Sequence, residues 1–210
     1  MEKQRKIKVL SIIALVVAVL GLTVAFAALS ETLTINGTAS VDAATWDVHF
    51  ENLKEINIHS KYGTVVENSS PILTENSIKN IDVTISSPGD YLDYQVDIVN
   101  SGTVAAKVSS VDISPLCTLE SSVESCDWDN DGEVTQEDVN NVNKNITFTY
   151  GFGFGETAID INTIPSEALN PGNKIEFTII LNFSNDVDEL PKRDLKFSDL
   201  SVTVNYVQTD

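Results

Sequence analysis

The twelve residues from Asp127 to Asp138 carry the pattern with the clearest chemistry in this chain. Their sequence is Asp-Trp-Asp-Asn-Asp-Gly-Glu-Val-Thr-Gln-Glu-Asp, with a carboxylate at the first, third and fifth positions and glycine at the sixth. Calcium takes about six to eight oxygen ligands, and alternate carboxylates on a tightly turned backbone converge on one point. The segment therefore predicts a calcium site, with these ligands: Asp127, Asp129, Asp131, the Glu133 carbonyl and Asp138.

The last position of this loop departs from the EF-hand pattern, which has glutamate there. A shorter aspartate, Asp138, resembles the calcium loops of dockerin modules. No incoming helix is expected because Cys126 directly precedes the loop, whereas residues 135–144 are compatible with a short outgoing helix. In so acidic a chain the alternative is a solvated cluster of charges, but the order D-x-D-x-D-G favours calcium. The ion would stiffen this segment by relieving repulsion among the carboxylates.

Both cysteines of the chain, Cys117 and Cys126, lie just before this loop. In an exported protein, two cysteines at this short spacing predict a disulfide across a loop, and the alternative is a pair of buried thiols. The C-x-x-C spacing of redox motifs is absent from the sequence. We therefore predict a stapled insertion, residues 114–145, where the strand pattern of the chain stops.

Motifs and composition argue against several classes of function. The chain contains neither H-E-x-x-H nor G-x-S-x-G, and we predict that it is not an enzyme. Its histidines, His49 and His59, fall on the polar faces of strand-like segments; surface histidine is the favoured interpretation, and a metal site with Glu51 or Glu55 the alternative. With 13 basic and 31 acidic residues, the net charge is −18. No basic patch is present to neutralise phosphates, so we expect no nucleic-acid partner.

The N-terminus has the pattern of an export signal. A basic region from Lys3 to Lys8 precedes an uncharged apolar run from Val9 to Leu29. The small residues of Ala25-x-Ala27 suit a signal peptidase, so we predict a signal peptide over residues 1–27, cleaved between Ala27 and Ala28. The apolar run also reaches the length of about 20 residues that spans a bilayer, so a retained membrane anchor is the alternative.

Beyond this leader the hydrophobic pattern has mostly a period of two, which is typical of strands with one buried face. Long helical patterns are absent, so we predict an all-β fold, an antiparallel β-sandwich formed by residues 28–210 as one domain. About nine strands are expected. They lie at 33–35, 46–51, 55–59, 81–85, 92–98, 104–113, 146–154, 175–183 and 200–207.

Two stretches of this pattern resemble each other. Pro88-Gly89-Asp90 and Pro171-Gly172-Asn173 each combine the fixed φ of proline with the positive φ open to glycine, and each precedes an alternating strand. The likeness predicts equivalent strands in the two halves of the sandwich. The following Asn100-Ser101-Gly102 is expected to be the turn that closes the first of these strands into a hairpin with residues 103–113.

Several of these segments together resemble the TasA/camelysin family of secreted biofilm-matrix proteins. The resemblance covers the leader ending at Ala28, the early strand at residues 32–35, the Pro88-Gly89-Asp90 turn, and the stretch Asn-Ser-Gly-Thr-Val-Ala-Ala-Lys-Val at residues 100–108. It extends well over the leader and the first half of the remaining chain, and loosely over the second half. The calcium-like loop and the cysteine pair lie outside the resemblance.

The resemblance implies a fold, a location and a mode of assembly. It implies a jelly-roll sandwich, processing by a SipW-type signal peptidase, and extracellular fibres in which the freed N-terminal strand completes the next subunit. Self-association is then the main expected partnership, and the membrane is a partner only through an uncleaved leader. Two alternatives stay open: a membrane-anchored adhesion or binding module, and a metalloprotease of the camelysin kind, for which the sequence shows no zinc-ligand motif.

Overall fold

The computed structural model describes residues 5, 8, 12–20, 43–59, 66–153 and 160–209. Contacts divide the chain into two units, Met1–Asp42 and Ala43–Asp210, which are described separately. In the first unit, residues 12–20 form an exposed helix. Among the described residues, no helix combines the length and the apolar character needed to cross a membrane. The predicted cleavage site at Ala27 and Ala28, and the predicted strand at 33–35, lie outside the described residues.

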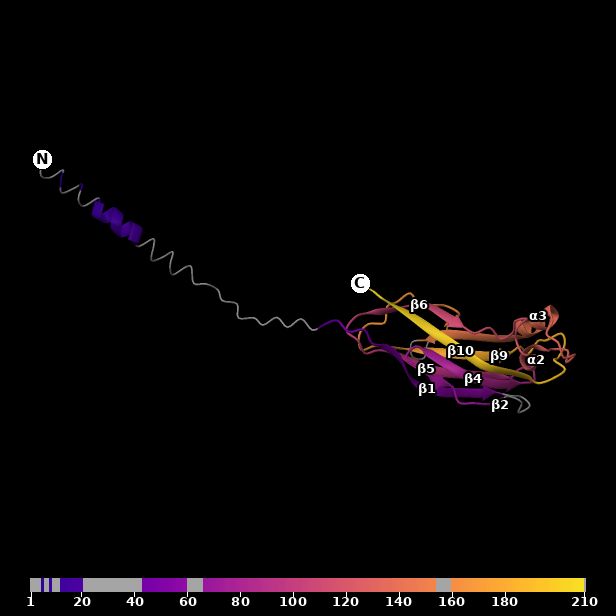
Figure 1. Cartoon of the computed structure of the whole chain (residues 1–210). Helices are drawn as coiled ribbons and strands as arrows, with labels where there is room; N and C mark the ends of the chain where they lie inside the picture. The colour runs from indigo at the N-terminus through magenta and orange to yellow at the C-terminus, as the bar shows by residue number, and fades with distance from the viewer. Residues whose placement is uncertain are drawn as a thin grey trace. The chain divides into compact units, whose positions relative to one another are not determined.

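The second unit is built from two antiparallel sheets that share one hydrophobic core (Figure 1). The first sheet has the order β1 (Val48–His59), β5 (Tyr91–Asn100), β9 (Lys174–Phe183), β7 (Ile146–Gly153) and β8 (Asp160–Ile161). The second has the order β2 (Val66–Glu67), β4 (Ser77–Ile85), β10 (Leu195–Gln208) and β6 (Ala106–Ile113), with β3 (Ile72–Leu73) also beside β4. The prediction of an all-β, two-sheet antiparallel arrangement is confirmed.

The core forms because alternate residues of each long strand face the other sheet. In β4 the buried positions Ile81, Val83 and Ile85 alternate with less buried ones. At the centre, Phe177 of β9 is fully buried and its ring lies 5.9 Å from that of Phe50 and 4.9 Å from that of Phe152. These rings and the aliphatic side chains around them supply most of the apolar burial that holds the two sheets together.

Two sequence predictions about strand pairing are wrong. The strands that follow Gly89 and Gly172 do not occupy separate halves, because β5 and β9 pair with each other, from Tyr91 opposite Asn182 to Val99 opposite Lys174. Nor does the turn after Asn100 close a hairpin, because β5 and β6 belong to different sheets. Local turn chemistry indicates where a strand ends, but the buried surface of the whole domain determines its neighbour.

The predicted insertion lies at one end of the sandwich. It contains a short helix, α2 (Val123–Cys126), and a longer one, α3 (Gln136–Asn145), which Figure 1 shows together at the end opposite the C-terminus of β10. The expectation of no helix before the acidic loop is wrong, because the single turn of α2 ends at Cys126, whereas the expected outgoing helix is confirmed as α3. Trp128 and Val142 of this segment are buried in the same core as the strands. The insertion is therefore packed on the sandwich and is not a separate domain.

Candidate functional site

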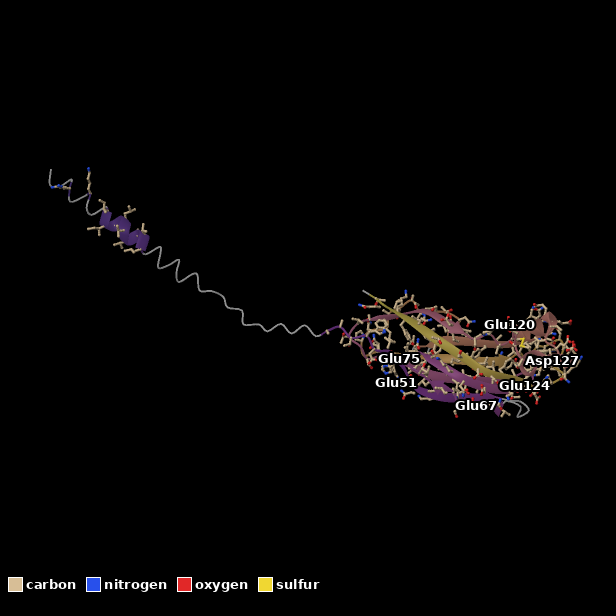
Figure 2. The ribbon with its side chains drawn as sticks, viewed as in Figure 1. Glu51, Glu67, Glu75, Glu120, Glu124 and Asp127 are labelled. Carbon is tan, nitrogen blue, oxygen red and sulfur yellow. A yellow bond between two sulfur atoms is a disulfide. The ribbon has the colours of Figure 1, made fainter. Side chains whose placement is uncertain are left out.

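Three of the predicted calcium ligands meet at this end of the molecule. Carboxylate oxygens of Asp127, Asp129 and Asp131 all lie within 4.8 Å of one another. Asp127 is fully buried, whereas the other two are exposed. Figure 2 shows Asp127 near Glu120 and Glu124 at the insertion, with Glu51 farther along the sheets. Among the described residues, no other group of three or more histidine, cysteine or acidic side chains has the spacing of metal ligands.

Backbone amides of the loop hold these carboxylates in place. The amide of Asp131 donates to Asp127 Oδ1 at 3.1 Å and to Asp129 Oδ1 at 3.3 Å, and the Gly132 amide donates to Asp127 Oδ2 at 3.0 Å. The Glu133 amide donates to Asp131 Oδ1 at 2.9 Å. A carboxylate oxygen accepts about two hydrogen bonds or ligand contacts, so Oδ1 of Asp127, of Asp129 and of Asp131, each with one such bond, keeps a lone pair for a cation.

Two residues of the loop have positive φ, which turns the backbone sharply. Gly132 has φ 93° and Asn130 has φ 60°. A Cβ on Gly132 would meet nothing within 4 Å, so its conformation and not lack of space favours glycine. The turn brings Asp131 back beside Asp127, which is the geometry that the sixth-position glycine predicts.

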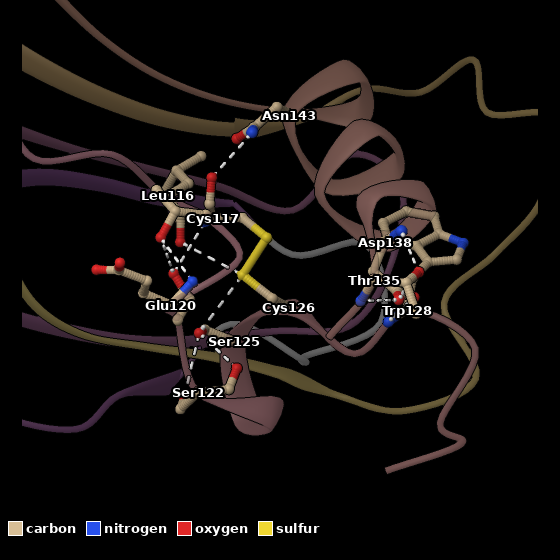
Figure 3. Close-up of a disulfide and its surroundings, with 12 residues drawn as sticks. Leu116, Cys117, Glu120, Ser122, Ser125, Cys126, Trp128, Thr135, Asp138 and Asn143 are labelled. Carbon is tan, nitrogen blue, oxygen red and sulfur yellow. Dashed lines mark hydrogen bonds between the residues drawn. A yellow bond between two sulfur atoms is a disulfide. The ribbon is translucent and has the colours of Figure 1, made fainter. Parts of the chain in front are cut away.

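The predicted closing ligand, Asp138, lies outside the group of three and caps helix α3 (Figure 3). Its Oδ2 accepts hydrogen bonds from the Thr135 amide at 2.9 Å and hydroxyl at 2.6 Å, and its Oδ1 accepts from the Trp128 amide at 3.0 Å. Burial raises the pKa of Asp138, but these bonds outweigh it and lower the pKa below its ordinary value. Asp138 thus forms a capping box with Thr135 at the end of the loop and also bonds to Trp128 at its start, so it connects the two ends. The Glu133 side chain also lies outside the group.

A residue that sequence reasoning missed completes the surroundings of Asp127. Arg193, in the segment between β9 and β10, places Nη1 3.5 Å from Asp127 Oδ2. The same segment contacts the insertion again, where the Lys192 amide donates to the Trp128 carbonyl at 2.9 Å and Lys144 pairs with Asp188 at 2.6 Å. No local signal marks Arg193, because 66 positions separate it from its partner.

The predicted disulfide is present, joining Cys117 and Cys126 with their Cα atoms 5.6 Å apart (Figure 3). Both residues are almost fully buried. The Asn143 amide group of α3 donates to the Cys117 carbonyl at 3.0 Å, so the closed loop is also attached to the helix that follows the acidic segment. The bridge ends at the residue next to Asp127 and restrains the start of the candidate calcium loop.

His49, considered as a metal ligand, lies near the start of the edge strand β1. It is placed between two carboxylates, Asp47 just before the strand and Glu51 within it. His49 Nδ1 lies 2.7 Å from Asp47 Oδ1, and its Nε2 lies 2.9 Å from Glu51 Oε1. The hydrogen bond to Glu51 raises the pKa of His49, burial partly opposes this, and the bond to Asp47 adds to the rise. These contacts are those of a charged surface cluster. The side chain of His59 lies outside the described residues.

A second candidate site lies where strand β6 at the edge of the second sheet approaches strand β7 of the first; we call this region the seam. Strand β6 pairs with β10 on one side, and among the described residues its other side has only a single bridge, from Ala106 to Leu169. Strand β7 pairs with β9 along its length. Within the described part of the chain, its other side pairs with β8 at Gly151 and Phe152, and the Tyr150 carbonyl accepts from the Asn162 amide at 2.8 Å. An open hollow of about 340 Å³ lies where these edges meet, with Ile113 and Phe148 among its lining residues.

Comparison with known proteins identifies no relative. No family model matches the chain, and neither does any curated protein or solved structure.

Proposed function

We propose that this protein is a secreted, self-assembling surface protein of the TasA/camelysin kind, a jelly-roll sandwich that forms fibres when an N-terminal strand of one subunit pairs with the next. The observation that carries the proposal is the seam between β6 and β7. Among the described residues, β6 ends the second sheet, residues 146–149 of β7 have no strand partner on the side away from β9, and a hollow of about 340 Å³ lies beside both strands. An extended segment placed there would form main-chain hydrogen bonds and cover the hollow.

Partly exposed apolar side chains beside the hollow also support the proposal that a strand is added there. Val111 and Ile113 of β6, and Phe148 and Tyr150 of β7, pack against the core yet stay partly exposed. Inner-face residues at the centre of the same sheets, such as Val96 and Val204, are fully buried. An added strand would remove the partly exposed group from water, which contributes about 25 cal/mol for each Å² of apolar surface covered.

The opposite edge of the first sheet is less suited to pairing. Strand β1 has two register shifts against β5, and Asn52 within it has φ 57°. Its first seven residues also carry charged side chains, including Glu51 and Lys54, and the Phe50 amide already donates to the Glu75 carbonyl. Bulges and charges of this kind protect an edge strand from further pairing. The seam is therefore the acceptor that we favour.

Deletion of residues 28–37 tests the proposal directly. We expect the shortened protein to stay monomeric under conditions where the processed chain forms fibres, as measured by electron microscopy and sedimentation. A Phe148→Lys variant should also fail to polymerise alone, because a charge would then lie in the acceptor hollow. Val66→Lys, at an exposed position on the far edge strand β2, is the control and should polymerise normally. Circular dichroism melts establish that each variant is folded.

Mixing the two defective proteins sharpens the test. The deletion variant can accept a strand but not donate one, and Phe148→Lys can donate but not accept. Their mixture should give dimers and no fibres, seen as a single shift in sedimentation. Fibres of unchanged yield from the deletion variant alone would refute strand donation.

We further propose that the Asp127–Asp138 loop binds calcium as a structural ion. The specific observation that favours this is the approach of three carboxylates to within 4.8 Å, held by amides that leave a lone pair open on each Oδ1 atom. Asp127, Asp129 and Asp131 would hold the ion, and neutralising their mutual repulsion would stiffen the insertion.

Thermal melting with and without calcium tests this second proposal. Calcium at about 100 times its dissociation constant should stabilise the protein by about 2.7 kcal/mol. The shift should disappear in Asp129→Ala and Asp131→Ala, and persist in Glu120→Ala, which changes an exposed acid outside the cluster. A shift that persists in both aspartate variants would exclude these ligands.

A further inference from the structure

The first described residues of the sandwich are held by hydrogen bonds and not by burial. Residues 43–47 are all exposed. The Thr45 amide donates to Thr103 Oγ1 at 2.8 Å, and the Thr103 amide donates back to the Thr45 carbonyl at 3.0 Å. The amides of Ser101 and Gly102 donate to the Asp47 carbonyl at 2.9 and 3.2 Å. The short segment before β1 is thus bonded to the turn that follows β5.

Gly102 makes this close approach possible. It is buried, and a Cβ at this position would lie 2.5 Å from the Thr45 carbonyl oxygen and 2.8 Å from the Asp47 amide nitrogen. Both neighbours are backbone atoms, so neither can rotate away as a flexible side chain would. Any side chain at position 102 must therefore displace residues 45–47 or the turn itself.

The side chain of Asn100 fixes the turn at residues 100–103 to the interior of the domain. This side chain is fully buried, and its Nδ2 donates to the carbonyls of Val104 at 2.9 Å and Leu169 at 2.8 Å. Its Oδ1 accepts from the Gly102 amide at 3.0 Å. A buried amide whose groups are all bonded is costly to move, because each broken bond leaves an unpaired polar group. The base of the turn is accordingly rigid.

We propose that the turn Asn100–Thr103 is a clamp that fixes the point where the N-terminal region of the chain leaves the sandwich. Strand β1 lies at the edge of its sheet and has two register shifts, so it is open to peeling from its N-terminal end. The clamp bonds the chain directly before that end. A pulling force on the preceding chain would then have to break the hydrogen bonds of residues 45–47 before it could separate β1 from β5.

The consequence for assembly rests on the proposed strand donation. In such a fibre the segment before residue 43 would be held by the neighbouring subunit, and the clamp would carry the connection between that segment and its own sandwich. Fibres of a clamp variant would form with normal yield and break sooner under sonication than those of the unaltered chain.

The clamp itself is tested in the monomer, by hydrogen exchange on the protein lacking residues 28–37. Gly102→Ala should increase exchange at the amides of Thr45, Ser101 and Thr103 by about tenfold or more, because their hydrogen bonds are broken. Exchange within β9 should not change. Ser101→Ala is the matched control: it alters an exposed side chain in the same turn and keeps the backbone bonds.

A milder variant keeps the test informative if Gly102→Ala does not fold. Thr103→Val removes only the hydroxyl that accepts the Thr45 amide, so exchange should rise at Thr45 and stay low at Ser101. Unchanged exchange at Thr45 in the folded variants would overturn the clamp. Faster exchange supports it even if the deletion protein still forms fibres, an outcome that would refute strand donation alone.

Discussion

Removal of the disulfide between Cys117 and Cys126 is expected to destabilise the whole sandwich. The bridge joins residues nine positions apart and closes a loop of both cysteines and the residues between them. In the chain-entropy treatment, closing a loop of this size restricts the unfolded chain by about 2.7 kcal/mol at 25 °C. Cys117→Ala with Cys126→Ala should therefore lower the free energy of unfolding by about that amount.

The effect should appear in global unfolding because the insertion belongs to the core. Cys126, Trp128 and Leu116 are buried together with the strands, and the Trp128 ring meets Phe183 of β9 edge-on at 6.1 Å. For a domain of this size, about 1 kcal/mol corresponds to a shift of about 2–4 °C in Tm. The double variant should accordingly melt about 5–11 °C below the unaltered protein.

Urea denaturation and thermal melting, both followed by circular dichroism, measure this difference. Leu119→Ala is the control, since it changes an exposed side chain inside the closed loop and leaves the bridge intact. The unaltered protein treated with a reductant should approach the stability of the double variant. If the double variant melted within about 1 °C of the control, the insertion would unfold independently, and its assignment to the common core would be refuted.

Four further outcomes follow from particular contacts. The raised pKa of His49 means that its bonds to Asp47 and Glu51 stabilise the protein fully below the ordinary pKa of 6.5 and less as pH rises through the raised value. The stability lost in His49→Gln, below about 1 kcal/mol, should thus be larger at pH 5.5 than at pH 8; equal losses in urea would contradict this. Thr135→Ala removes a helix cap and should cost about 0.5–2 kcal/mol, with Gln136→Ala as the control for urea denaturation. Phe177→Ala should cost about 3–5 kcal/mol, and a loss under 1 kcal/mol would contradict its central position in the core. Arg193→Gln should tighten calcium binding in calorimetry, because the ion no longer competes with a guanidinium for Asp127; weaker binding would count against this competition.

Much of the local structure could be predicted from the sequence because local physics determines it. Alternating apolar residues indicate strands wherever one face is buried, and the burial of β4 follows that pattern. In β5 the apolar residues Leu92, Tyr94, Val96 and Ile98 also alternate, although Asp93 and Asp97 between them are buried as well. The positive φ of Gly89 and Gly172 matches the turns expected there. Likewise, the order of acidic residues from Asp127 brings three carboxylates together, since the turn at Gly132 is a property of a few neighbouring residues.

Contacts between distant parts of the chain needed the tertiary structure. The roles of Asp138 as a capping residue, of Arg193 as the partner of Asp127, and of Gly102 as the point of close approach to Thr45 all depend on such contacts. The turn after Asn100 looks like a hairpin in sequence, yet it connects two sheets. Strand partners are selected by the total burial that the folded domain achieves, which no short stretch encodes.

The sequence by itself thus determined the positions of most long strands, the acidic loop and the pairing of two nearby cysteines, because each depends on interactions over a few residues. Only the tertiary structure decided which of the described strands lie at the sheet edges and where residues 45–47 are bonded to the turn after β5. Both are properties of the assembled sheets, since an edge exists only once every other strand has found its neighbour.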